Sequence, residues 1–151
     1  MKRQTVRFLL ERIARDAIDA GFPIVRASIR MLTDDGAGLQ IVAVWGKTSD
    51  VIRIGSLLGV GATSFPEVVR TDGPVTSGMV DETLAGEVLR SEGIRSWIAV
   101  PLRDSNGLPV GLLNLSSSEA KAFPNASLAF FEATARELER EILRLLQVPA
   151  R

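Results

Sequence analysis

Two stretches of this 151-residue chain carry the hydrophobic pattern of a β-hairpin, and these hairpins constrain the fold more than any other feature. In the first, apolar and polar residues alternate over residues 24–32, and a second apolar run follows a turn at residues 39–45. In the second, residues 97–102 and 109–115 flank an Asn106-Gly107 turn. Because the strands of a hairpin are antiparallel, a purely parallel sheet is excluded.

A helical pattern precedes the first hairpin, and another follows the second. Apolar residues recur at steps of three and four over residues 6–20, and Gly21 and Pro23 then end that helix. Residues 125–146 have the same periodicity, with charged side chains opposite the apolar stripe. These patterns predict a long amphipathic helix at each end of the chain.

The segment between the hairpins is irregular and interrupted by glycines. It predicts a short strand at residues 51–54 and an extended piece at residues 75–77. Two short helices are expected at residues 64–70 and 81–91, with Ser64 and Asp81 as their N-caps. Together the elements predict one α+β domain over residues 1–151, with the terminal helices on one face of an antiparallel sheet and the middle helices on the other.

Composition excludes several functions. The chain has no Cys and no His, so thiolate nucleophiles, disulfides, the usual haem ligand and the usual general base are all missing, and we expect no enzyme activity. Eighteen acidic and eighteen basic residues cancel, which gives no reason to expect nucleic-acid or membrane binding. With neither a signal peptide nor an apolar run of membrane-spanning length, the expected location is the cytoplasm.

The second half of the chain resembles the GAF domain family. The resemblance rests on a run of short motifs in order: Gly93-Ile94-Arg95-Ser96, Ala99-Val100-Pro101-Leu102, Gly107, Val110-Gly111-Leu112-Leu113-Asn114-Leu115, and Phe123 before a long helix. It extends over residues 3–147. The resemblance implies a sheet of five or six antiparallel strands, paired terminal helices on one face, a small-molecule pocket on the other, and a regulatory role in signalling or transcription.

Departures from the family's patterns exclude several of the ligands and reactions known in the family. Covalent bilin attachment and methionine sulfoxide reduction use cysteines in this family, and haem-binding members use a histidine, so none of these is expected here. Asn114, Lys121 and Phe123 resemble part of the cyclic-nucleotide signature, but its Asp-Glu pair is missing after Phe123. The remaining expectation is a non-covalent ligand without a cofactor.

Candidate ligand contacts come from polar and aromatic residues in or near the strands. Arg26, Ser28 and Arg30 share one strand face, and Arg30 offers a planar fork to a carboxylate or phosphate of a small anionic metabolite. That face could equally be solvated or paired with Asp81 or Glu82. The other candidates are Trp45, Ser77, Leu84, Val88, Ser96, Trp97 and Asn114. The tryptophans could instead be core residues, and Ser96 and Asn114 could bond to backbone.

The terminal helices carry more apolar residues than one sheet face can cover, which predicts a homodimer. The candidate interface residues are Phe8, Ile13, Phe130, Leu138, Ile142 and Leu146. Three functions follow: a ligand-binding regulatory domain that signals through the helices of a dimer, a ligand-free dimerisation or protein-interaction module, and a hydrolytic enzyme built on carboxylates. The first is the leading hypothesis.

Overall fold

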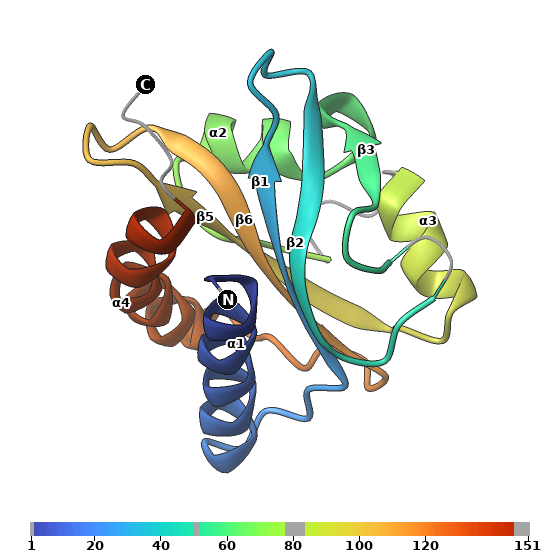
Figure 1. Ribbon diagram of the computed structural model, residues 1–151. Helices are drawn as coiled ribbons and strands as arrows, with labels where there is room; N and C mark the ends of the chain where they lie inside the picture. Colours follow the sequence, from blue (N-terminus) through green and yellow to red (C-terminus); the bar gives the residue numbers. More distant parts are fainter. Residues whose placement is uncertain (1, 50–51, 78–83, 147–151) are drawn as a thin grey trace.

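A six-stranded antiparallel sheet forms the centre of the molecule (Figure 1). The computed structural model describes residues 2–49, 52–77 and 84–146. The strands are β1 (Arg26–Leu32), β2 (Gly38–Gly46), β3 (Leu57–Gly59), β4 (Val75–Thr76), β5 (Ser96–Arg103) and β6 (Pro109–Ser117). They lie in the order β3-β2-β1-β6-β5-β4, so the two predicted hairpins are adjacent and the central pair is β1 and β6.

Helices cover both faces of the sheet. The described helices are α1 (Lys2–Asp19), α2 (Phe65–Thr71), α3 (Leu84–Ser91) and α4 (Leu128–Leu146), with short 3-10 turns at Val60–Ala62 and Asn125–Ser127. Helices α1 and α4 lie side by side on one face, α1 against β1 and β2 and α4 against β5 (Figure 1). Helix α2 packs on the opposite face, against β5 and β6. The predicted α+β fold is confirmed.

The main core lies between the terminal helices and the sheet. Ala27, Ile29 and Met31 of β1 point into it, together with the apolar stripes of α1 and α4. Strand β5 is buried along all but its last residue, as expected for a strand covered on both faces. This packing closes one face of the sheet and leaves the other for a site.

Two details of the middle segment differ from the prediction. Residues 52–54 are not a strand, and residue 51 lies outside the described residues; the backbone turns at Gly55 (φ +92°), and the edge strand β3 follows it. Ser64 does occupy the N-cap position of α2, but its side chain makes no capping bond, and the Thr63 Oγ1 accepts a hydrogen bond from the Phe65 N–H instead. Asp81, the other predicted N-cap, lies outside the described residues.

The predicted dimer-interface residues fall into three groups. Ile13 and Leu138 are wrong as interface residues, because they lie on the helix sides that face the sheet and are buried in the main core. Phe8 is 69% exposed and Phe130 is 37% exposed, so both stay candidates. The side chains of Ile142 and Leu146 lie outside the described part of the structure.

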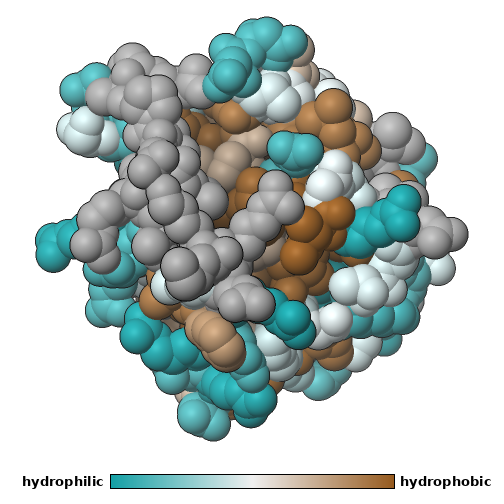
Figure 2. Space-filling model, viewed as in Figure 1, coloured by the Kyte–Doolittle hydropathy of each residue, from teal (hydrophilic) through white to brown (hydrophobic). Residues whose placement is uncertain are grey.

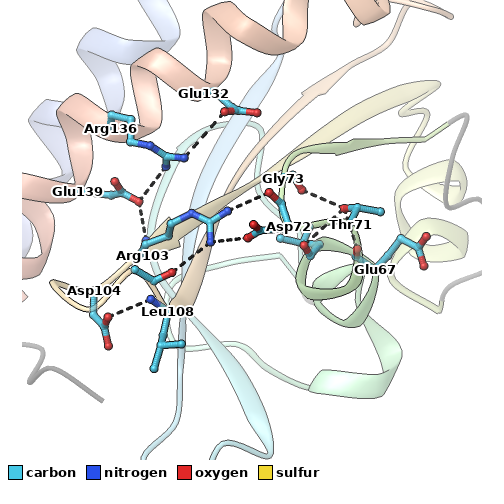
Figure 3. Close-up of polar contacts among 12 residues, drawn as sticks. Glu67, Thr71, Asp72, Gly73, Arg103, Asp104, Leu108, Glu132, Arg136 and Glu139 are labelled. Atoms are coloured by element: carbon cyan, nitrogen blue, oxygen red, sulfur yellow. Dashed lines mark hydrogen bonds and ion pairs between the residues drawn. The ribbon is translucent and has the colours of Figure 1, made fainter.

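A polar network centred on Arg103 joins the two faces of the molecule at one end of β5 (Figure 3). The Arg103 N–H donates to Glu139 Oε2 on α4 at 2.6 Å, and its guanidinium pairs with Asp72, the residue that ends α2, at 2.9 Å. Burial raises the pKa of Glu139 despite its bonds to Arg103 and Arg136. The network therefore connects the middle segment to the C-terminal helix.

No helix among the described residues combines the length and hydrophobicity needed to cross a membrane.

Gly111 tests how closely the two central strands are packed. A Cβ at this position would collide with the backbone oxygen of Arg30 and lie 2.7 Å from Met31 Sδ. We expect Gly111→Ala to lower the free energy of unfolding by about 3 kcal/mol, because backbone cannot move aside as a flexible side chain does. Urea unfolding measures this difference.

Gly59→Ala is the matched control, because a Cβ at Gly59 meets nothing within 4 Å and Gly59 also lies in a strand. It should change stability by less than about 0.5 kcal/mol. Equal losses in the two variants would contradict the close packing of β1 on β6.

Candidate functional site

A row of polar side chains crosses the sheet face that the terminal helices leave open. It consists of Arg26, Ser28 and Arg30 on β1 and Asn114 on β6, and we call it the polar row. The three β1 residues are each less than 5% exposed. Alternation along β1 places Ala27, Ile29 and Met31 on the helix side, as predicted. Val25 was expected with them, but it precedes the strand and packs on the opposite side, against the cluster that contains Trp97.

The first arginine of the row is neutralised within the chain. Arg26 Nη2 lies 3.1 Å from Glu92 Oε1, and Nη1 donates to the backbone oxygen of Lys47. Lys47 Nζ in turn donates to the Glu92 backbone oxygen at 2.9 Å. Arg26 therefore links β1 to Lys47, which follows β2, and to Glu92, which follows α3.

The second arginine has no such partner. The Arg30 side chain is 4% exposed, its Nε is buried without a hydrogen bond, and no ion pair joins it to any other residue within the described ranges. Burial, and to a smaller extent the nearby charge of Arg26, lowers the pKa of Arg30 to about 10. The guanidinium stays protonated at neutral pH, so the site holds a buried positive charge that needs an anion.

Asn114 adds a second unused donor to the same face. It lies opposite Ser28 across the β1–β6 ladder, and its Nδ2 is buried without a hydrogen bond. Buried donors without partners are rare in folded proteins. The Nε of the Arg30 cation and the Nδ2 of Asn114 together fit a ligand that supplies several acceptor oxygens, as a carboxylate or phosphate does.

Three small apolar clusters surround the polar row. Leu112 flanks Arg30 on β6 and belongs to the cluster under α2, which contains Phe65 and Val68. On the β2 side, Arg30 lies beside Ile41, which packs with Val44 and Ile52. The third cluster joins Leu89 of α3 to Ile94 and Trp97. These clusters shield the row from water and strengthen its electrostatic interactions.

Several predicted ligand contacts are placed elsewhere. Trp45 is wrong as a pocket residue: it pairs with Ala27 and packs against the core on the helix side. Val88 is half-buried and is not part of the described cluster around Trp97. The Leu84 side chain lies outside the described residues, as do Asp81 and Glu82, the carboxylates that the sequence offers as internal partners for the arginines.

Ser77, Ser96 and Trp97 gather around a different hollow. They line a cavity of about 530 Å³ where β5 begins, which we call the β5 cavity. The Ser96 hydroxyl donates to the Glu119 backbone oxygen at 2.6 Å and accepts from the Ala122 N–H, and Trp97 is only 6% exposed. Both residues therefore have the structural roles that the sequence left open as alternatives.

The sequence analysis did not identify several charged residues that contact the polar row or line the β5 cavity. Glu92 balances Arg26, and Arg90, Arg95 and Lys121 line the β5 cavity. No local pattern marks Glu92 or Arg90, because the residues that they contact are distant in sequence. Arg95 and Lys121 stand in motifs of the family resemblance, but the sequence analysis did not predict them as ligand contacts. No group of three or more acidic, Cys or His side chains that could hold a metal ion occurs among the described residues.

Comparison with known proteins assigns the fold to one family. The model of the GAF domain matches residues 3–142 of the chain. A search of curated protein sequences returned no match.

Solved structures with the same fold have diverse roles. The GAF domain of a phosphoenolpyruvate-protein phosphotransferase from Coxiella burnetii is 17% identical, with a TM-score of 0.74 over 97% of this chain and 84% of that one. A type II free methionine-R-sulfoxide reductase from Thermoplasma acidophilum is 16% identical, with a TM-score of 0.73 over 96% and 97%. The GAF domain of a two-component sensor histidine kinase from Bacillus halodurans is 20% identical, with a TM-score of 0.67 over 91% and 96%. At these identities the likeness concerns the fold.

The two arginines of the polar row should respond oppositely to the same substitution. Arg26→Met should lower the free energy of unfolding by about 3 kcal/mol, because it leaves Glu92 as a half-buried charge without its partner. Arg30→Met should raise it by about 2 kcal/mol, because it removes a buried charge that has no described partner. Urea unfolding at pH 7 without added ligand measures both.

A loss of stability in Arg30→Met comparable to that in Arg26→Met would mean that a carboxylate of the chain pairs with Arg30. Asp81→Asn and Glu82→Gln would then identify it, since the variant lacking the partner would lose the same stability.

Proposed function

The chain belongs to the GAF domain family, and on that premise we propose that it is a regulatory domain that binds a small anionic metabolite. The ligand binds without a covalent bond and without a haem or bilin cofactor. Its binding is relayed through the terminal helices of a homodimer to the rest of a cytoplasmic signalling or transcription-regulatory protein. The alternative is a dimerisation module that binds no ligand.

The buried guanidinium of Arg30 is the observation that carries this proposal. A charge held away from water without a counter-ion is unfavourable by several kcal/mol, so a site of this kind gains stability when an anion enters it. The charge-assisted hydrogen bonds between a carboxylate and the guanidinium contribute roughly 1.5–3 kcal/mol each. Asn114 supports the proposal because its unused Nδ2 lies on the same face.

The chemistry of the site favours binding over catalysis. The reductases of this fold, as the family resemblance implies, use cysteines, and this chain has none. The sequence contains no His, and Glu92, the described carboxylate that is bonded to the polar row, is paired with Arg26 through Oε1, while its Oε2 is buried without a hydrogen bond. The unpartnered atoms of Arg30 and Asn114 are donors, which hold an anion but do not remove a proton from it.

The Arg103 network supports relay to the terminal helices. Its guanidinium is bonded to Asp72 at the end of α2, and its backbone N–H is bonded to Glu139 of α4 (Figure 3). Helix α2 packs on Leu112, which flanks Arg30. A displacement of α2 by a ligand would therefore act on α4 through one residue, Arg103, whose guanidinium contacts Asp72 and whose backbone N–H contacts Glu139.

Ligand binding is tested by thermal-shift screening of small carboxylates and inorganic phosphate against the purified chain. At a ligand concentration 100 times Kd, binding stabilises the folded protein by about 2.7 kcal/mol. We expect at least one anion to raise the melting temperature of the wild type and none to raise that of Arg30→Met.

Arg53→Met is the matched control, because Arg53 is an exposed arginine outside the polar row. It should keep the full ligand-induced shift. If no anion stabilises the wild type, or if Arg30→Met responds as the wild type does, ligand recognition by Arg30 is disproved and the dimerisation module becomes the better assignment.

The exposed apolar residues of the terminal helices favour dimerisation. Phe8 of α1 is 69% exposed, so its aromatic ring is left largely uncovered by the chain itself. Figure 2 shows further hydrophobic surface over β2, beside the terminal helices. Leu9, Val42 and Trp45 are only partly buried where they pack on the core of this side.

Sedimentation velocity tests the dimer. Phe8→Glu should weaken self-association at least about tenfold, because buried aromatic side chains dominate the energy of interfaces. Ile54→Glu is the control, since Ile54 is 50% exposed but lies in the middle segment. A monomer in the wild type at high micromolar concentration, or equal effects of the two variants, would refute an interface at Phe8.

A further inference from the structure

The buried side-chain atoms that lack a hydrogen-bond partner gather at the polar row. Among the described residues these atoms are Arg30 Nε, Asn114 Nδ2 and Glu92 Oε2. Arg30 and Asn114 belong to the row, and Glu92 is bonded to Arg26 at its other end. Because nearly all buried polar groups in folded proteins are hydrogen-bonded, unused atoms at one place point to a shared partner from outside the chain.

The unused atoms are two donors and one acceptor. Arg30 Nε and Asn114 Nδ2 carry N–H groups, whereas a carboxylate oxygen such as Glu92 Oε2 can only accept. Glu92 Oε1 lies 3.1 Å from Arg26 Nη2, so the second oxygen is the one left over. The anion of the proposed function would satisfy both donors, but Oε2 would repel it. A ligand that uses all of these atoms therefore carries an anionic group and a separate hydrogen-bond donor.

The register of β1 on β6 sets the distance between the donors and the acceptor. Asn114 lies opposite Ser28, which is midway between Arg26 and Arg30 on the strand. Two residues of a strand span about 7 Å. Burial and, to a smaller extent, the charge of Arg26 lower the pKa of Arg30, so the two ends of the row interact. A chain of about four carbon atoms, with a hydrogen bond of about 3 Å at each end, is long enough to join them.

The charges of the row favour a ligand with one negative charge and a neutral donor. The Arg26 guanidinium and the Glu92 carboxylate cancel, which leaves the charge of Arg30 unbalanced among the described residues. A carboxylate balances that charge, whereas a phosphate dianion exceeds it. An amino acid has no net charge and would leave Arg30 uncompensated. A hydroxyl donates to Glu92 Oε2 without adding charge.

We propose that the ligand of the polar row is a hydroxycarboxylate. Its carboxylate accepts hydrogen bonds from Arg30 and Asn114, and its hydroxyl donates to Glu92 Oε2. This inference rests on the proposed function, because it names the class of anion that Arg30 binds. Glu92 then has two roles, since one oxygen holds Arg26 and the other selects the ligand.

Matched four-carbon acids test the hydroxyl on the wild-type chain, by isothermal titration calorimetry at pH 7. The probes are butyrate, 3-hydroxybutyrate, 4-hydroxybutyrate and 4-aminobutyrate, which share the carboxylate and the carbon chain. We expect at least one hydroxybutyrate to bind about tenfold more tightly than butyrate, the gain from one hydrogen bond to a charged acceptor. The zwitterion 4-aminobutyrate should bind more weakly than that hydroxybutyrate, because it brings no net charge to Arg30.

Glu92→Gln tests whether Glu92 recognises the hydroxyl. The amide oxygen must face Arg26, so the amide N–H₂ takes the place of Oε2, and the ratio of the butyrate and hydroxybutyrate dissociation constants should fall from about ten to about three or less. The ratio is compared because a change in stability or at Arg26 affects both acids alike. Glu87→Gln, the same substitution at an exposed position of α3, should keep the full ratio.

The hydroxycarboxylate is overturned if neither hydroxybutyrate binds more tightly than butyrate, if 4-aminobutyrate binds most tightly, or if Glu92→Gln keeps the full ratio. In each of these cases, butyrate binding that is lost in Arg30→Met leaves the proposed function intact. A lack of binding by all four acids also overturns the hydroxycarboxylate, and the wider anion screen then decides the proposed function.

Discussion

The burial of β1, from Arg26 through Met31, is the constraint on which the rest of the structure depends. Strand β1 lies between β2 and β6, with the terminal helices on one side and the middle segment on the other, so its side chains leave water on both faces. Alternation then sends Ala27, Ile29 and Met31 to one face and Arg26, Ser28 and Arg30 to the other. Apolar residues on the second face would have been enough to bury the strand on both sides. The two arginines instead require the middle segment to provide charge, and it does so for only one of them among the described residues.

The two arginines of the polar row have different surroundings, and only Arg26 has a partner among the described residues. Arg26 is bonded to Glu92 and to the backbone beyond β2, and this pairing fixes the position of the chain after α3. Arg30, four residues along the same face, faces Ile41 and Leu112 across the two neighbouring ladders. Apolar neighbours shield a charge without neutralising it, so burial of Arg30 opposes folding of the empty domain. In the proposed function, the same buried charge is what binds the anion.

The elements that local periodicity defines could be predicted from the sequence, and features that depend on register could not. The hairpins and both terminal helices follow from steps of two and of three to four residues. The face occupied by Trp45 could not be predicted, because the β1–β2 register shifts at a bulge between Ile29 and Arg30 that leaves Val42 as an extra residue. As a result, Ile41 and Ala43 point to opposite faces of the sheet although they are two residues apart. Ile13 and Leu138 were assigned to an interface because the apolar stripes of the helices are wide and do not show which edge meets the sheet. The short apolar run at residues 52–54 resembles a strand, but Gly55 turns it away from the sheet.

The same dependence on distant neighbours explains why the candidate site was found only in part. Arg26, Ser28, Arg30 and Asn114 are identifiable as polar interruptions of apolar strands, whereas Glu92 and Arg90 lie in a segment where charged residues are ordinary. These residues contact the two places because the fold brings the end of α3 next to both the polar row and the β5 cavity. Leu89 packs on Trp97, Arg90 lies over that ring in the β5 cavity, and Glu92 holds Arg26 in the polar row. Residues 89–92 therefore connect the wall of the β5 cavity to the polar row within one turn of the chain.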